Sequence, residues 1–87
     1  MSAAAMSPEQ SRAARAWLGW SQAELADRAG VATTTVHGFE SGQRKLTRNN
    51  LAALRRAIEA QGIRLLFDQT GAAAGIVRQN VELDFSL

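Results

Sequence analysis

The 87-residue chain contains no cysteine and no tyrosine, and only one histidine and one proline. The lack of cysteine excludes disulfides, a thiolate nucleophile and a cysteine-based zinc site. Because His37 is the only histidine, a metal site built from several imidazoles is excluded as well. No apolar run reaches 18 residues, so no membrane span is expected, and the first residues lack the pattern of a secretion signal. These absences favour a small cytoplasmic domain that works by binding rather than by catalysis.

Positive charge is concentrated in the middle of the chain, although the net charge is only +2 with His37 neutral. Residues 1–67 carry nine cations and five anions, whereas residues 68–87 carry one cation and three anions. No acidic residue lies between Glu40 and Glu59. That interval holds a basic block, which suits an anionic partner; its cations are Arg44, Lys45, Arg48, Arg55 and Arg56.

Residues 8–62 are expected to form four to five short helices. Ser7 with Gln10, and Ser21 with Glu24, have the spacing of capping boxes at helix starts. Thr47 is a further N-cap candidate. Glycines end the segments, which gives predicted helices at about 8–18, 22–29, 32–41 and 48–61. The expected inward-facing residues include Trp20, Leu25, Val36, Phe39, Leu51, Leu54 and Ile58.

After Gly62 the pattern changes from helix to strand. Residues 63–67 are branched and aromatic, which predicts a strand; 68–75 read as a turn or flexible loop, and 76–78 as the start of a return strand. Because an isolated strand is unstable, 63–67 should pair with 76–78 or with its copy in a second subunit. The alternation over 81–87 predicts another strand or a partner-binding segment, or else a frayed terminus.

We therefore divide the chain into three parts. Residues 1–7 are expected to be a flexible N-terminus and residues 8–62 a single helical domain. Residues 63–87 form a C-terminal strand and tail, suited to dimerisation or partner binding. Trp17 is expected in the core, or else on a dimer surface.

Residues 22–41 have the features of a helix-turn-helix, in which two short helices are joined by a tight glycine turn. Ala26 is small where the helices must cross, and Gly30 permits the positive φ of the turn. A purely structural helical hairpin is the alternative, but such a hairpin rarely needs all of these features at this spacing.

These residues resemble the lambda-repressor-like domains, also called the Xre family, over about residues 8–62. The matching segments are Ser21-Gln22-Ala23-Glu24-Leu25-Ala26, Ala29-Gly30-Val31, Phe39-Glu40 and Gly42. The resemblance implies a mainly α fold, with a short C-terminal β strand or hairpin added here. It also implies a domain that binds double-stranded DNA without a cofactor, usually as a homodimer on a palindromic operator.

The resemblance also implies roles for individual residues. Thr33, Thr34 and His37 would lie on the outward face of the recognition helix and contact bases, although His37 could equally be an idle surface residue. Gln22, at the start of the preceding helix, would contact a phosphate. The remaining expected phosphate contacts follow the recognition helix and are Arg44, Lys45 and Arg48.

The family pattern further implies an internal ion pair between Arg15 and Glu40 that orients the recognition helix. Three features depart from the pattern. Ala32 stands where a capping hydroxyl is usual, and Gly38 lies inside the recognition helix where a long side chain often reads a base. The outward face also lacks Arg, Asn and Gln, which are the usual bidentate base readers.

The favoured function is a dimeric transcriptional regulator, most simply a repressor that occludes a promoter. The alternative is an antitoxin of a toxin-antitoxin pair, which would bind a toxin protein through the tail and autoregulate its operon. Some antitoxins of this family, the HipB type, join two subunits through a strand after the last helix. An enzyme is disfavoured, since no acid pair is placed for acid–base chemistry.

Overall fold

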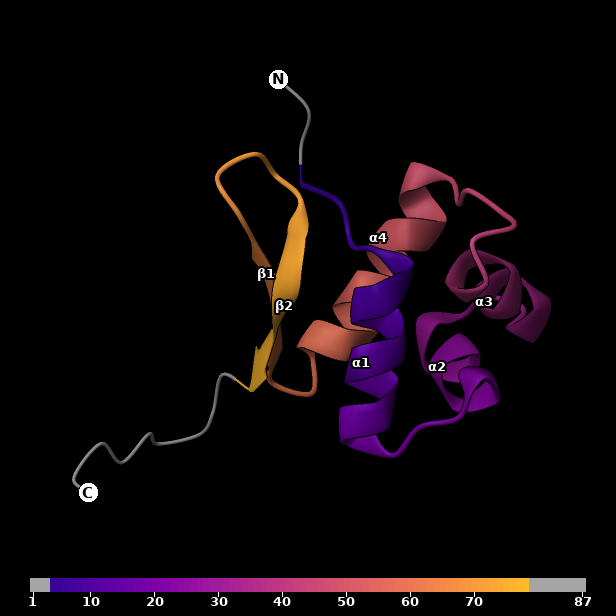
Figure 1. The fold of residues 1–87 in the computed structure, drawn as a ribbon. Coiled ribbons are helices and arrows are strands. Elements are labelled where there is room, and N and C mark those ends of the chain that lie inside the picture. Colours follow the sequence, from indigo (N-terminus) through magenta and orange to yellow (C-terminus); the bar gives the residue numbers. More distant parts are fainter. Residues whose placement is uncertain (1–3, 79–87) are drawn as a thin grey trace.

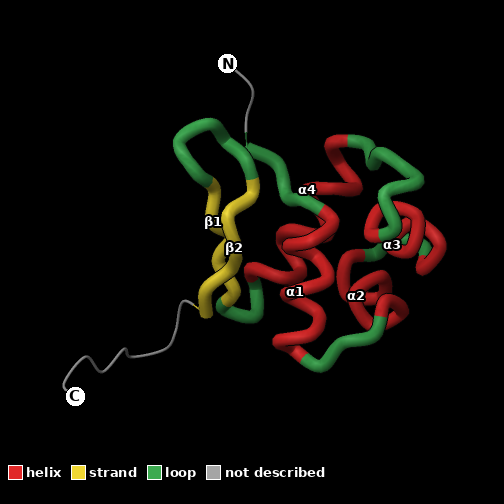
Figure 2. Tube along the Cα trace, viewed as in Figure 1, coloured by secondary structure: helices red, strands yellow, loops and turns green. Residues whose placement is uncertain are grey.

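Four helices and a two-stranded hairpin make up the computed structural model, which describes residues 4–78 (Figures 1 and 2). The helices lie together, and the hairpin covers one side of them (Figure 1). This is the mainly α fold with a C-terminal hairpin that the sequence predicts. The elements in chain order are α1 (Pro8–Leu18), α2 (Gln22–Ala29), α3 (Thr33–Glu40), α4 (Arg48–Glu59), β1 (Ile63–Phe67) and β2 (Ala73–Arg78).

The helix starts follow the predicted capping residues. Ser7 Oγ accepts from the Gln10 amide at 3.1 Å, and the Gln10 side chain accepts from the Ser7 amide at 3.1 Å, so the capping box is complete. The second box, between Ser21 and Glu24, is also complete, and Thr47 caps α4. By contrast α3 has no side-chain cap, because its N-cap residue is Ala32. These local patterns are confirmed because they depend only on residues three positions apart.

The turn between α2 and α3 has the predicted left-handed glycine. Gly30 adopts φ +73°, a backbone conformation that costs other residues energy because of their Cβ. The amide of Val31 then bonds back to the carbonyl of Ala26 at 3.0 Å, which closes α2. Ala26 is buried, and α2 packs against both α3 and α4. The turn and the small residue therefore set how α3 leaves the domain.

The core lies between the helices and one face of the hairpin. Trp20, Leu25, Val36 and Phe39 are buried as predicted. Trp17 is not in the core, since 61% of its surface is exposed. Met6, which we grouped with the leading segment, is only 3% exposed and belongs to the core. The remaining core residues are Ala14, Ala26, Leu54, Ile58, Ile63 and Leu65.

The hairpin pairs β1 with β2 in antiparallel register within the chain, from Ile63 opposite Arg78 to Phe67 opposite Ala73. The register shifts between Leu66 and Phe67, so the ladder is irregular there. β2 begins at Ala73, whereas the sequence analysis left residues 73–75 in the loop. The alanines there gave no strand signal; pairing with β1 determines their conformation. The alternating segment 81–87 lies outside the described residues.

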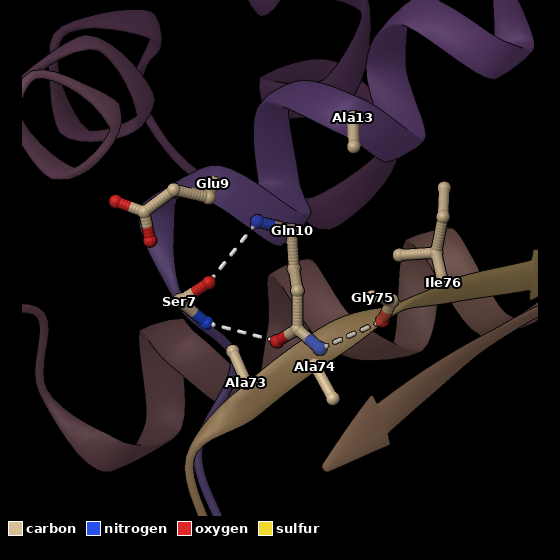
Figure 3. Close-up of a pocket in the computed structure, with 8 residues that line it drawn as sticks. All are labelled: Ser7, Glu9, Gln10, Ala13, Ala73, Ala74, Gly75 and Ile76. Carbon is tan, nitrogen blue, oxygen red and sulfur yellow. Dashed lines mark hydrogen bonds between the residues drawn. The ribbon is translucent and has the colours of Figure 1, made fainter. Parts of the chain in front are cut away.

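One side chain of α1 ties the helices to the hairpin. The Gln10 amide nitrogen donates to the Leu66 carbonyl at 2.8 Å and to the Gly75 carbonyl at 2.9 Å, beside the irregular part of the ladder. Figure 3 shows Gln10 reaching from α1 to Gly75, while its oxygen returns to the Ser7 amide. Gln10 thus completes the cap of α1 and satisfies one carbonyl on each strand.

Candidate nucleic-acid interface

The eight residues of α3 divide into two faces. Val36, Phe39 and Glu40 are buried, since the helix lies against α1 and α2. Thr33, Thr34 and His37 are exposed, as the sequence analysis expected. Thr35, whose place was left open, is buried at 9% exposure. In Figure 1, α2 and α3 lie on the side of the molecule away from the hairpin, so the hairpin leaves the outward face of α3 uncovered.

A basic loop adjoins this face. Arg44 and Lys45 lie between α3 and α4, and Arg48 is the first residue of α4. All three side chains are exposed. Within residues 4–78 none of them forms an ion pair. Their positive charge is therefore available to an external anion beside the outward face of α3.

Glu40, the last residue of α3, ties this helix to α1. Its residue surface is only 2% exposed. Arg15 Nη2 lies 2.7 Å from Glu40 Oε1, and Arg15 Nε lies 2.9 Å from Oε2. The structure thus brings together the two residues that the family resemblance pairs. Two parallel N–H···O bonds fix the geometry of the carboxylate as well as its charge.

Further donors from α1 complete the environment of Glu40. Ser11 Oγ donates to Glu40 Oε2 at 2.6 Å, and Arg12 donates to the backbone carbonyl of Glu40. Ser11, Arg12 and Arg15 lie within one turn of α1, so a single stretch of that helix holds the C-terminal end of α3. Sequence reasoning missed Ser11 and Arg12. The i, i+4 spacing of Ser11 and Arg15 was the available signal, since it places both on one helix face.

The carboxyl of Glu40 is held in its charged form. Burial disfavours that form, but hydrogen bonds from Arg15, Ser11 and Gln22 outweigh it and hold the pKa of Glu40 below its usual range. The hydrogen bond to Glu40 in turn raises the pKa of Arg15. The pair therefore stays ionised at neutral pH, and the end of α3 has a fixed charge partner.

Gln22 connects this buried pair to the outward face. Its amide nitrogen lies 3.2 Å from Glu40 Oε1, and its amide oxygen lies 3.3 Å from His37 Nδ1. A carboxylate can only accept, so the amide nitrogen must face Glu40 and the amide oxygen must face His37. His37 then presents an N–H at Nδ1, which leaves Nε2 as its outward nitrogen. The sequence analysis assigned Gln22 to a phosphate; the structure gives its side chain two partners inside the protein.

Gly38 also has a specific neighbour. A Cβ built on this residue would lie 3.2 Å from Arg44 Cβ and 3.3 Å from Arg44 Cδ. The loop after α3 therefore turns back until the stem of Arg44 lies against the helix at its glycine. Neither the capping patterns nor the family resemblance indicated this contact.

Other kinds of site find little support in residues 4–78. No group of three or more His, Asp and Glu side chains there could hold a metal ion. A shallow depression between the start of α1 and β2 is lined mostly by small side chains and by Gln10 (Figure 3). No helix among these residues is long and apolar enough to cross a membrane.

Comparison with known proteins agrees with this arrangement. The family model described as Helix-turn-helix matches residues 12–64, a range that contains α2, α3, the basic loop and the Arg15–Glu40 pair. No curated protein matches the chain. The chain belongs to the lambda-repressor-like (Xre) helix-turn-helix family, whose domains bind DNA in transcription regulators.

Proposed function

We propose that the chain acts as a dimeric transcriptional repressor that places α3 in the major groove of a palindromic operator. The observation that carries the proposal is the outward face of α3, with Thr33, Thr34 and His37 exposed next to the unpaired cations of the loop. The major groove of B-DNA accommodates an α-helix and presents a different pattern of donors and acceptors for each base pair.

The exposed residues of α3 suit contacts with base edges. A threonine hydroxyl can donate to or accept from a base, and its methyl group can contact the methyl group of thymine. His37 directs Nε2 outward, and in the neutral ring that nitrogen accepts, since Nδ1 carries the hydrogen. A neutral His37 therefore suits a base amino group, whereas a protonated one suits a guanine acceptor or a phosphate.

Lys45 and Arg48 suit the phosphates that border the groove, and the amide groups at the start of α2, beside Gln22, suit another. Arg44 adds a third cation to the loop. Phosphate contacts position the protein and release counterions, so affinity should fall with salt. The logarithmic slope should be about −0.9 for each phosphate neutralised.

Selection of duplexes from a random pool, followed by salt titration of the enriched sequence, tests this function. We expect a two-fold-symmetric sequence whose half-sites lie about 34 Å apart, one helical turn. Lys45→Ala and Arg48→Ala should each weaken binding to all sequences and lower the slope by about one unit. Arg56→Ala is the matched control, because it removes an exposed cation of α4. Failure to enrich any duplex, together with salt-insensitive binding, would reject the proposal.

The dimer has two candidate surfaces. One edge of β1 pairs with β2 inside the chain, so a second copy would have to use another edge or face of the hairpin, where Leu66 and Val77 are exposed. The alternative surface is around exposed Trp17 on α1. Sedimentation of Trp17→Lys, and of Leu66→Lys combined with Val77→Lys, decides between them: the variant that becomes monomeric identifies the surface. A monomeric wild type on its operator would reject the dimer.

The antitoxin alternative remains a prediction. It depends on the tail, and residues 79–87 lie outside the described part of the chain. A toxin gene beside this gene, and capture of its product by the full chain but not by a chain ending at Arg78, would favour it.

A further inference from the structure

Gly38 interrupts the outward face of α3. It follows Thr34 by four residues and is next to His37, so it lies on the same side of the helix as the proposed base contacts. Glycine is a poor helix former, and this one does not adopt a positive φ. Its reason is therefore not the backbone conformation, and must be the space above its Cα.

That space is taken by Arg44. The carbonyl of Gly38 accepts hydrogen bonds from the amides of Gln43 and Arg44, both at 3.1 Å, and from Ser41 Oγ at 3.1 Å. These bonds fold the loop back over the helix. The Arg44 stem then lies where a side chain of residue 38 would begin, with a distance of 3.2 Å from the ideal Cβ position to Arg44 Cβ.

The guanidinium of Arg44 has no competing partner in the described residues. The side chain is exposed, and among residues 4–78 the ion pairs involve Arg12, Arg15 and Arg55. An arginine whose stem rests on α3 differs from Lys45 and Arg48, for which no contact with α3 is recorded. Its five donors project from the outward face of the helix itself.

We propose that Arg44 reads a guanine in the major groove, taking the place of the side chain that α3 lacks at Gly38. The inference rests on the proposed function and names a specificity determinant within it. Arginine donates two parallel hydrogen bonds to O6 and N7 of guanine, which is the commonest specific contact in this groove. It supplies the bidentate reader that the residues of α3 themselves do not provide.

Duplex selection with the full-length wild type and Arg44→Ala tests the assignment, with Lys45→Ala as the matched loop control. We expect one guanine per half-site to be selected by the wild type and by Lys45→Ala, but not by Arg44→Ala. Loss of the contact should cost about 5- to 150-fold in discrimination at that position. If Arg44→Ala weakens all duplexes equally and keeps every base preference, Arg44 is a phosphate contact and the inference is wrong.

Base modification gives an independent measurement. Replacing the selected guanine by 7-deazaguanine removes the N7 acceptor and leaves the base pair intact. Wild-type affinity should fall severalfold, whereas Arg44→Ala should bind both duplexes equally. Equal losses in the two proteins would show that another residue reads N7 and would overturn the assignment.

Gly38→Ala tests the role of the glycine. Alanine favours the helix, so the variant should fold, as circular dichroism would verify, but its methyl group must displace the Arg44 stem. We expect the guanine preference to weaken by less than in Arg44→Ala, with the salt slope unchanged. Full retention of the preference would refute the role given to Gly38. Absence of any selected duplex for the wild type would instead reject the proposed function itself.

Discussion

The two faces of α3 use polar residues in opposite ways. On the inner face Glu40 is almost fully buried, and its carboxylate accepts hydrogen bonds from Arg15, Ser11 and Gln22. On the outer face Thr33 and Thr34 are exposed, and residues 4–78 offer their side chains no hydrogen-bond partner. One helix of eight residues thus carries both a satisfied polar network and an unsatisfied one.

This difference separates stability from binding. A buried charge that loses its partner destabilises the fold strongly, whereas exposed polar groups contribute little to folding and remain available to a ligand. Substitutions on the inner face should therefore change the free energy of unfolding. Those on the outer face should change the free energy of DNA binding.

The largest expected effect is that of Arg15→Ala. The variant leaves the Glu40 side chain, which is 1% exposed, without its charge partner, and this should cost roughly 3–5 kcal/mol of stability. For a domain of this size the loss corresponds to a fall in Tm of roughly 15–30 °C. Thermal unfolding measures it. Arg56→Ala, an exposed cation, should stay within about 0.5 kcal/mol of the wild type; equal losses in the two variants would contradict the difference between the faces.

A smaller loss is expected for Glu40→Gln. Its remaining partner, the Arg15 side chain, is 19% exposed and can recruit water, so about 2 kcal/mol should be lost at neutral pH. Because the folded state lowers the pKa of Glu40, the wild type loses this contribution as pH falls through that lowered value. Glu40→Gln cannot lose it, so the stability difference between the two proteins should shrink in acid. A difference that is independent of pH would show that the charge of Glu40 contributes nothing.

The outer face has a matched set of three consecutive threonines. Thr34→Ala should weaken binding to the selected duplex by about 1–2 kcal/mol and change stability by less than about 0.5 kcal/mol. Thr35→Ala, at the buried position, should lower stability by about 1 kcal/mol without altering base preference. Titration of labelled duplex and chemical denaturation give the two quantities. Reversed effects at residues 34 and 35 would mean that α3 presents another face to DNA.

How much of this arrangement the sequence predicts depends on the range of the interaction. The capping boxes at Ser7 and Ser21 and the turn at Gly30 were predictable, since each involves residues a few positions apart. The family resemblance supplied the Arg15–Glu40 pair across 25 residues, which local patterns could not. Gln10 joins α1 to a carbonyl 56 residues away, and no periodicity signals such a contact.

The same reasoning explains the errors. Apolar spacing placed Trp17 inside, yet the turn of α1 that carries it has no element packed over that side chain. The role of Gly38 was undetermined because its neighbour, Arg44, belongs to a loop whose path follows from three hydrogen bonds to one carbonyl. Sequence patterns describe single elements well; they do not describe where a loop returns.

The smallest effect tests the N-terminal end of α3, where the two faces meet. Ala32 is the N-cap, with φ −73° and ψ 146°, and it gives the helix no side-chain cap. Its backbone already has the conformation of a capping residue, and its side chain is exposed. Ala32→Ser should therefore add a hydroxyl acceptor for an unpaired amide of the first turn and raise stability by about 0.5–1 kcal/mol.

The effect of Ala32→Ser on DNA binding separates two causes of the alanine. If the open cap only weakens the helix, the serine variant gains stability and binds the operator at least as well as the wild type. If the free amides at the start of α3 contact a phosphate, the serine hydroxyl competes for them, and affinity falls while stability rises. Denaturation and duplex titration of the same preparation distinguish these results. A serine variant that gains no stability would contradict the assignment of Ala32 as a missing cap.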